Sequence, residues 1–387
     1  MWVLLLVTLF STCACEPDKL LKENVSNAKV QLSVLLEASE SGDALRIPSS
    51  FKNGEVQFVP EDDWVSGFFA GTLWYMFELT GDEMWARHAR RHTEKLDSIQ
   101  YLQWHHDVGF MVYDSYGNGL RLKHIKEYED VIMNTARSLS TRFRPAAGVL
   151  QSWNVDRDWQ ALRGWKCPVI IDNMMNLELL FNATRISGDS TYFKVAVSHA
   201  DKTIENHFRP DGSCYHVVDY DPETGEIRRR CTAQGFADES AWARGQAWAI
   251  YGYAMAYQYT GYERYLEQSE KTAAYVLSRL PEDMVPYWDY DCPDIPNTYH
   301  DASSAAIMAS AFYHLYTITG KKEYRLAADK TLEALSTPAY RATAGTNGGF
   351  ILMHSVGSVP HGGGIDVPLI YADYYFLEAL IRRKNLQ

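Results

Sequence analysis

Residues 67–92 read GFFAGTLWYMFELTGDEMWARHARRH. The first part, up to Thr80, is apolar on nearly every side, whereas the part after Gly81 mixes charged and apolar residues. A helix that is apolar all round belongs inside a protein, and an amphipathic helix can cover it from outside. Glycine suits the left-handed position that ends a helix. The stretch therefore predicts a helical hairpin, in which an inner helix is followed by an outer one.

The same hairpin pattern recurs along the chain at uneven intervals. An aromatic residue stands four positions, and a small residue eight positions, after each of Gly81, Gly188, Gly261 and Gly320. In a further copy His124 takes the glycine position and Tyr128 the aromatic one. Offsets of four and eight lie on one face of a helix. The intervals of 43, 64, 73 and 59 residues are too irregular for a short solenoid repeat and favour hairpins with variable loops.

We count six such hairpins and expect them to close into a double ring. Inner helices are predicted near residues 63–79, 107–122, 172–186, 239–260, 301–319 and 366–383. Outer helices are predicted near residues 19–38, 82–100, 126–143, 190–207, 262–280 and 322–336. The β structure that we predict is one small hairpin insertion over residues 213–230, with its turn at Pro222 to Gly225. The chain is therefore predicted to be all-α, with a single domain over residues 18–387.

The composition of the 387-residue chain is that of an ordinary globular protein. Hydrophobic residues make up 46% and charged residues 22%, which excludes a disordered or collagen-like chain. The net charge is −12 and no run of Lys and Arg is longer than Arg228-Arg229-Arg230, so we do not expect nucleic acid as a partner. The many aromatic residues suit sugar rings, but they suit an ordinary core as well.

The first fifteen residues, MWVLLLVTLFSTCAC, are predicted to be a secretory signal peptide. Their apolar run is too short to span a membrane. The segment that ends at Cys15 resembles the cleavage motif of bacterial lipoproteins, although Thr12 and the absence of Lys and Arg depart from that motif. We therefore expect an exported protein, periplasmic or at the cell surface, with Cys15 as a candidate lipid anchor to the membrane.

Acidic residues mark the start of every predicted inner helix. They are Asp63, Asp107, Asp172, Asp238 with Glu239, Asp301 and Asp366. If the inner helices are parallel, these carboxylates open on one face of the ring. Aspartate is a preferred N-cap residue and suits the positive end of the helix dipole, so each acid has a structural interpretation. Two of them would suffice for general acid–base work on a sugar, but the pattern alone does not select the pair.

The sequence does not favour a metal or an organic cofactor. The run His105-His106-Asp107 is not a ligand spacing on one helix face. Cys167, Cys214, Cys231 and Cys292 form no CxxC pair, and we expect buried or free thiols. The sequence also contains no P-loop, dinucleotide-binding glycine motif or nucleophile elbow. We therefore predict neither metal nor cofactor.

Arg244 stands at the start of a predicted inner helix, four residues before Trp248 and on the same face. An inward-facing arginine is costly unless it meets an anion. Two partners are open at this point: a negatively charged substrate, or one of the aspartate caps.

Five stretches match one known family in their order along the chain. They are DDWVSGFFAGTLWYMFELTGD (62–82), HHDVGFM (105–111), IIDNMMNLELLFNAT (170–184), QGFADESAWARGQAWAIYG (234–252) and IDVPLIYADYYFLEAL (365–380). With these stretches the chain resembles the unsaturated glucuronyl hydrolases of glycoside hydrolase family 88. The resemblance implies an (α/α)6 barrel, in agreement with the six hairpins. It also implies hydration of the C4=C5 double bond of the unsaturated uronic acid that polysaccharide lyases leave on small oligosaccharides, without a cofactor.

The resemblance implies roles for particular residues. Asp172 would be the general acid and base, and Asp107 its essential partner. The substrate-binding residues would be Trp64, His106, Trp153, His216, Gln234, Arg244 and Trp248. A helix N-terminus lowers the pKa of Asp172, whereas an ionised Asp107 and burial would raise it. We therefore expect the two carboxyl groups to titrate as a coupled pair.

One position departs from the family pattern. Members that accept sulfated disaccharides have an arginine just before the glutamine of the QG motif, where this chain has Ala233. Ser355 and Ser358 keep another part of that pattern. The sequence therefore leaves the sulfation, the linkage and the parent polysaccharide of the substrate open, as well as the oligomeric state.

Two other functions compete with the main interpretation. The first is another enzyme on the same ring, either an unsaturated rhamnogalacturonyl hydrolase or an inverting glycosidase that acts on saturated sugars. The second is an inactive glycan-binding lipoprotein, and the presence of both Asp107 and Asp172 counts against it.

Overall fold

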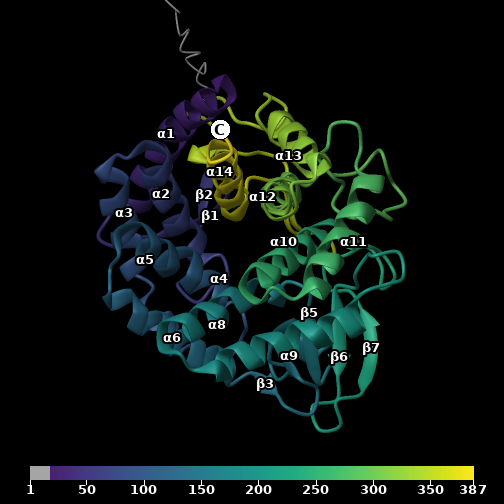
Figure 1. The fold of residues 1–387 in the computed structure, drawn as a ribbon. Helices are drawn as coiled ribbons and strands as arrows, with labels where there is room; N and C mark the ends of the chain where they lie inside the picture. Colours follow the sequence, from purple (N-terminus) through teal and green to yellow (C-terminus); the bar gives the residue numbers. More distant parts are fainter. Residues whose placement is uncertain (1–17) are drawn as a thin grey trace, which may run out of the picture.

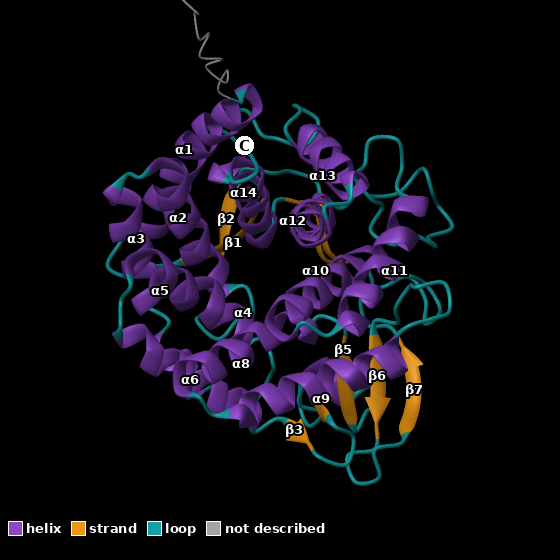
Figure 2. Ribbon diagram, viewed as in Figure 1, coloured by secondary structure: helices purple, strands orange, loops and turns teal. Residues whose placement is uncertain are grey.

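Two concentric rings of helices make up most of residues 18–387, which is the part of the chain that the computed structural model describes (Figures 1 and 2). The inner ring consists of α2 (Ser66–Thr80), α4 (Val108–Val112) with η2 (Tyr113–Gly117) and α5 (Asn118–Lys123), α8 (Asn173–Ser187), α10 (Ala243–Thr260), α12 (Ala302–Thr319) and α14 (Ile370–Lys384). The outer helices are α1 (Lys19–Glu40), α3 (Glu83–Glu94), α6 (Glu127–Ser140), α9 (Ser190–His207), α11 (Glu263–Arg279) and α13 (Lys322–Leu335). The predicted signal peptide and Cys15 lie outside the described residues.

The inner ring closes on itself. Each inner helix packs against the next one along the chain, and α14 packs against both α12 and α2. Each of the outer helices α3, α9, α11 and α13 packs against the inner helix that precedes it. The predicted (α/α)6 arrangement of six hairpins is therefore confirmed, and the predicted helix boundaries agree with the observed ones to within a few residues for most helices.

Left-handed residues end the inner helices as the repeat predicts. Gly81, Gly188, Gly261 and Gly320 have φ between 68° and 74°, and each donates its N–H to the carbonyl four residues back. His124, in the glycine position of the further copy, has φ 52°. A residue with a Cβ adopts this conformation at a cost, so local geometry explains the glycine at four of the five positions.

The inner helices are buried along almost their whole length. In α10 and α12 every residue of the first fourteen or so positions is buried, which accounts for their apolar and small side chains. Among the described residues, no helix is long and apolar enough to cross a membrane. The apolar runs of the sequence therefore form the core of the double ring.

In the described part of the chain, four small antiparallel sheets are attached to the ring, and one of them contains the hairpin predicted from the sequence. The predicted hairpin exists as β6 (Val217–Tyr220) and β7 (Ile227–Cys231), and β5 (Cys167–Ile170) extends it to three strands. Three further antiparallel pairs were not predicted: β1 (Ile47–Lys52) with β2 (Glu55–Val59), β3 (Phe143–Arg144) with β4 (Val149–Leu150), and β8 (Ser355–Ser358) with β9 (Gly363–Val367).

Only some of the acidic residues predicted at the starts of inner helices lie at these starts in the structure. Asp107, Asp172 and Asp301 are the N-cap residues of α4, α8 and α12, and Asp63 lies in the turn before α2. The prediction is wrong for Asp238 with Glu239 and for Asp366. α10 begins only at Ala243, after a turn in which Asp238 accepts a hydrogen bond from the N–H of Thr232. Asp366 belongs to β9, because a strand pair occupies the segment before α14.

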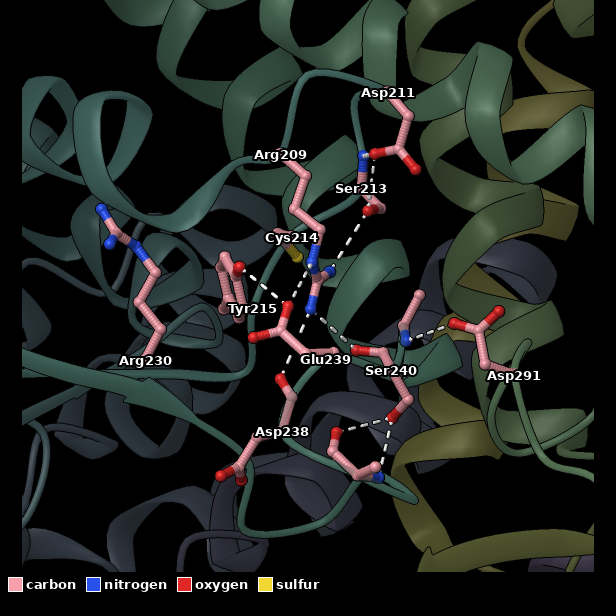
Figure 3. A network of polar contacts seen from close by, with 12 residues as sticks. Arg209, Asp211, Ser213, Cys214, Tyr215, Arg230, Asp238, Glu239, Ser240 and Asp291 are labelled. Atoms are coloured by element: carbon pink, nitrogen blue, oxygen red, sulfur yellow. Dashed lines mark hydrogen bonds and ion pairs between the residues drawn. The ribbon is translucent and has the colours of Figure 1, made fainter.

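A polar network fixes the loop that leads into α10 (Figure 3). Arg209, just after α9, donates to the backbone carbonyls of Asp238 (3.4 Å) and Ser240 (3.2 Å). Its guanidinium also lies 3.8 Å from the ring centroid of Tyr215, whose hydroxyl donates to Glu239. These contacts fix the loop before α10 on its outer side. The other side of the same loop faces the candidate active site.

Candidate active site

Asp172 stands between β5 and the first turn of α8. It is the N-cap residue of this helix, but its carboxylate accepts no hydrogen bond from the first turn. The residue is only 8% exposed, and its Oδ2 atom is buried without a hydrogen-bond partner. A buried carboxyl oxygen without a partner is costly. The structural interpretation of Asp172 as a helix cap therefore fails, and its placement needs another reason.

The surroundings of Asp172 favour its protonated form. Burial raises the pKa of this carboxyl to about 7, and the nearby Asp107 contributes in the same direction, whereas Arg244 opposes both. The indole N–H of Trp248 also favours the ionised form, although its Nε1 makes no standard hydrogen bond. Near neutral pH, Asp172 can therefore both give and take a proton, as general acid–base work requires.

Asp107, the N-cap residue of α4, has a lowered pKa, in contrast to Asp172. Burial alone would raise its pKa, but the imidazoles of His106 and His105 outweigh this effect and hold the pKa below its usual value. The Oδ1 atom lies 3.2 Å from Nε2 of His106. Burial lowers the pKa of His106 to about 4, so this imidazole is neutral near pH 7. Asp107 is thus an ionised carboxylate whose charge raises the pKa of Asp172. The coupled titration of the two groups stays a prediction.

His216 points one defined N–H group toward Asp172. Its Nδ1 accepts hydrogen bonds from the backbone N–H groups of Ala233 (3.0 Å) and Gln234 (3.2 Å). Burial, together with the charge of Arg244, holds the pKa of His216 well below its ordinary value, so the ring is neutral. The proton of a neutral ring with an accepting Nδ1 must sit on Nε2. That nitrogen lies 3.8 Å from Oδ2 of Asp172, which leaves its N–H available near the reacting centre.

Arg244 enters the site from the first turn of α10, and an aspartate cap is its partner. It is 1% exposed, and its Nη1 lies 3.4 Å from Oδ2 of Asp301. Its guanidinium also donates to the carbonyls of Val356 and Gly357 in β8. The Nε atom has no partner. The second of the two partners considered for Arg244 is therefore present, while its charge still reaches Asp172 and His216.

Three of the predicted site residues are tryptophans, and each has a different environment. Trp64, just before α2, packs against Phe110 and Tyr371 with ring centroids 6.0 and 5.0 Å away. Trp153 lies 6.2 Å from the ring of His216. Trp248 is fully buried, so it is not an exposed wall as predicted. Gln234 completes the set, because its side chain donates to the carbonyl of Gly357 (3.2 Å).

Direct interactions link eight of the nine predicted residues, whereas Trp64 is linked to Trp248 only through the ring of Phe110. Their roles stay predictions. The structure also adds residues that sequence reasoning did not place there. Asn176, one turn after Asp172 on α8, accepts a hydrogen bond from the N–H of Phe110 (2.9 Å) and favours the ionised form of Asp107. Its spacing from Asp172 could have indicated it. Trp159 and Trp165 pack against Trp153, with ring centroids 5.1 and 5.7 Å away. Trp159 lies in the four-residue helix α7 (Asp158–Ala161), which is too short to give a periodic signal, and Trp165 lies in the loop that follows.

The cluster has the chemistry of a general acid–base centre. One carboxyl with a pKa of about 7 lies beside an ionised carboxylate, a neutral imidazole N–H and an arginine. Within residues 18–387, no group of three or more His, Cys, Asp or Glu side chains is arranged to hold a metal ion. The four cysteines of this region are buried and unpaired, as predicted. Two carboxyl groups at inner-helix starts, one with a raised and one with a lowered pKa, are suited to general acid–base work on a sugar.

Comparison with known proteins identifies the family. Residues 45–379 match Glycosyl Hydrolase Family 88, and the chain belongs to this family. An unsaturated glucuronyl hydrolase from Formosa agariphila is 47% identical over 334 residues, which are 86% of this chain and 82% of the relative. An unsaturated glucuronyl hydrolase from Bacillus sp. (strain GL1) is 36% identical over 347 residues, or 85% of this chain and 89% of the relative.

Solved structures agree with this assignment. The crystal structure of an unsaturated glucuronyl hydrolase specific for heparin has a TM-score of 0.90 and 42% identity, and the match covers 96% of this chain and 98% of that one. A mutant enzyme from Streptococcus agalactiae, complexed with dGlcA-GalNAc6S, has a TM-score of 0.80 and 29% identity, with 94% and 91% covered. The (α/α)6 fold and the glycoside hydrolase class predicted from the sequence are therefore confirmed.

Proposed function

We propose that this chain hydrates the C4=C5 double bond of an unsaturated uronic acid at the non-reducing end of a small oligosaccharide and thereby releases the rest of the saccharide. The observation that carries the proposal is the carboxyl pair. Asp172 has a pKa of about 7 and a partner-free Oδ2, and it lies beside the ionised Asp107. The names of the relatives, which are unsaturated glucuronyl or chondroitin disaccharide hydrolases, support the same reaction.

The chemistry needs one group that first gives and then takes a proton. Protonated Asp172 donates its proton to C4, and the electron pair of the double bond forms the new C4–H bond. The positive charge that develops at C5 is shared with the ring oxygen. Asp172, now ionised, accepts a proton from a water molecule whose oxygen bonds to C5, which restores the acid. The resulting hemiketal opens, and the anomeric carbon, now a hemiacetal, releases the remaining saccharide.

The neighbouring residues support both half-steps. The negative charge of Asp107 raises the pKa of Asp172 and also stabilises the positive charge that develops on the sugar ring. The Nε2–H of His216 is free to donate to a substrate oxygen, because the Nδ1 atom is already occupied. Arg244 provides positive charge for the uronate carboxylate. Trp64 and Trp153 offer apolar ring faces for the sugar.

The reaction predicts a defined isotope pattern. In deuterium oxide, one deuterium should appear at C4 of the released uronate, on a single face. In oxygen-18 water, the label should enter at C5 before the ketone exchanges with solvent. The ultraviolet absorbance of the double bond should disappear, and the saturated counterpart of the substrate should not react. Label at the anomeric carbon with none at C4 would overturn the proposal and favour the inverting glycosidase.

We also propose that residues 1–15 direct export and that Cys15 carries a lipid that anchors the enzyme at the cell surface. The apolar segment and the motif that ends at Cys15 support this proposal. Expression of the full chain in a bacterium fed with labelled palmitate tests it. Wild type should incorporate label and fractionate with membranes, whereas Cys15→Ala should do neither. A mature protein that starts after a different residue, without label, would refute the anchor.

A further inference from the structure

Asp289 is a fully buried carboxylate next to the loop that leads into α10. Its Oδ2 accepts hydrogen bonds from the N–H of Phe236 (2.8 Å) and the hydroxyl of Ser240 (2.7 Å). Its Oδ1 accepts one from the N–H of Asp291 (2.9 Å). A buried carboxylate is costly unless donors surround it. The three donors are neutral, so this carboxylate holds two segments of backbone together and does not balance a charge on any of them.

Two of the three donors belong to the loop 232–240, which forms neither helix nor strand. Backbone groups outside regular structure depend on side chains for their hydrogen bonds. Arg209 binds carbonyl groups of this loop from its outer side (Figure 3). Asp289 binds an N–H group and a hydroxyl of the same loop. The two side chains thus fix the loop through both its acceptors and its donors.

The first residues of the same loop set the state of His216. The N–H groups of Ala233 and Gln234 both donate to Nδ1 of this ring, at 3.0 and 3.2 Å. A neutral imidazole carries one proton, on either nitrogen, and two donors at Nδ1 force that proton onto Nε2. Nε2 lies 3.8 Å from Oδ2 of Asp172. With the proton on Nδ1 instead, Nε2 would present a lone pair to Asp172 and compete with C4 for its proton.

The main chain of His216 is held by contacts that do not involve the loop. Its carbonyl accepts a hydrogen bond from the N–H of Ile171 (3.0 Å), the residue before Asp172. Gln246 of α10 accepts from the N–H of Cys214 (2.8 Å) and donates to its carbonyl (3.1 Å). The position of the imidazole is therefore fixed from β5 and α10. What the loop controls is the nitrogen that carries the proton.

We infer that Asp289 is a positioning residue: through the loop 232–240 it keeps His216 in the tautomer whose proton sits on Nε2, beside Asp172. The hydrogen bonds from Phe236 and Ser240 hold the far part of the loop, and the loop then presents its two N–H groups to Nδ1. The inference rests on the proposed function, because that function gives the Nε2–H of His216 its use.

Asp289→Asn in the full chain tests the inference. Asparagine has one oxygen and one NH2 group, so one of its two sides must face an N–H donor with a donor of its own. Nitrogen-15 NMR of histidine-labelled protein at pH 7 reports the tautomer, and His216→Gln assigns the signals. Wild type should show an unprotonated Nδ1 and a protonated Nε2, whereas the variant should show both nitrogens partly protonated. Its kcat/KM for an unsulfated, unsaturated disaccharide should fall about tenfold, because the donor near the reacting centre is misplaced.

Gly235→Ala disturbs the same contact from the side of the loop. A Cβ at this position would lie 3.0 Å from Oδ2 of Asp289 and 2.8 Å from Oγ1 of Thr232, so the loop or the carboxylate must move. The variant keeps every hydrogen-bonding group of the site. We expect the same change of tautomer, smaller than in Asp289→Asn. This variant carries the test alone if Asp289→Asn does not fold.

Asp373→Asn is the matched control, because Asp373 is also fully buried and its carboxylate also holds backbone, through the N–H groups of Ile351 and Leu352. It should lower the Tm and leave the His216 tautomer as in wild type. An unchanged tautomer in Asp289→Asn and Gly235→Ala, or the same change in Asp373→Asn, would overturn the inference. The NMR measurement needs no substrate, so wild type that hydrates no unsaturated disaccharide would refute the proposed function and leave this readout intact.

Discussion

Asp172 and Asp301 occupy the same place in the fold, but their environments are opposite. Each is the N-cap residue of an inner helix, and each is buried. Asp301 accepts hydrogen bonds from the N–H and hydroxyl of Ser303 and the hydroxyl of Ser304, and it pairs with Arg244. Asp172 caps nothing and has one oxygen without a partner. Both carboxyl oxygens of Asp301 accept hydrogen bonds, whereas one oxygen of Asp172 accepts none.

The difference separates a structural carboxylate from a reactive one. The hydrogen-bond donors around Asp301 stabilise its negative charge, and this charge pairs with Arg244. The start of α12 therefore contributes to the stability of the fold. At Asp172 burial is not compensated, and the pKa rises to about 7. A protein keeps such an unfavourable arrangement where the chemistry needs it. The helix-cap pattern in the sequence is common to both residues, and only the surrounding donors distinguish them.

The largest expected effect is on turnover. Asp172→Asn keeps the shape of the side chain but removes the transferable proton, so kcat should fall about 10²–10⁴-fold, the usual contribution of a general acid–base group. The loss of ultraviolet absorbance of an unsaturated disaccharide measures it. If Asp172 were a cap, asparagine would replace it well and turnover would stay near normal; that result would end the catalytic assignment.

Stability of the same variant provides a second check. The folded-state pKa of Asp172 is raised, so the carboxyl disfavours folding once it must ionise. Its contribution is fully favourable below about pH 4 and is lost as the pH rises through about 7. Relative to wild type, Asp172→Asn should therefore gain thermal stability between pH 4 and pH 8. A Tm difference that does not change with pH would contradict the raised pKa.

The second effect is the loss of stability at the other helix start. Asp301→Asn leaves the buried Arg244 without its anion, and breaking a buried pair by removing one partner costs about 3–5 kcal/mol. Urea unfolding at pH 7 measures this loss. Asp189→Asn is the control, because Asp189 caps α9 with a single hydrogen bond at the surface. Similar midpoints for the two variants would show that Asp301 is no more structural than an ordinary surface cap.

A feature could be predicted from the sequence when the residues that form it lie close together along the chain. The hairpins were predictable, because the glycine that ends a helix and the apolar face before it lie within one stretch of chain. Asp107 and Asp172 came from family motifs; both are buried, and burial raises the pKa of Asp172, whereas the imidazoles of His106 and His105 outweigh burial at Asp107. The partner of Arg244 was left open, because Asp301 and Val356 lie 57 and 112 residues away.

The third expected effect is on substrate binding. It concerns Arg244, which pairs with Asp301 and whose charge also reaches Asp172. Arg244→Lys keeps a positive charge, but lysine cannot reproduce the fork that reaches both Asp301 and the carbonyls of β8. We expect KM to rise about tenfold with little change in kcat. Steady-state kinetics on the unsulfated disaccharide measure both constants. An unchanged KM together with lower stability would make Arg244 purely a structural partner of Asp301.

The smallest effect is a shift in the pH profile. Because Asp172 must begin the reaction protonated, kcat/KM should fall as the pH rises through about 7. The ionised Asp107 raises the pKa of Asp172, so Asp107→Asn should move this alkaline limb to lower pH. Arg244 acts in the opposite direction, and Arg244→Gln should move the limb to higher pH. Where turnover is too slow, carbon-13 NMR of labelled aspartate follows the same carboxyl, with Asp172→Asn to assign its signal. Limbs that stay in place in both variants would mean that neither charge reaches Asp172, and that burial without hydrogen-bond donors is what distinguishes it from Asp301.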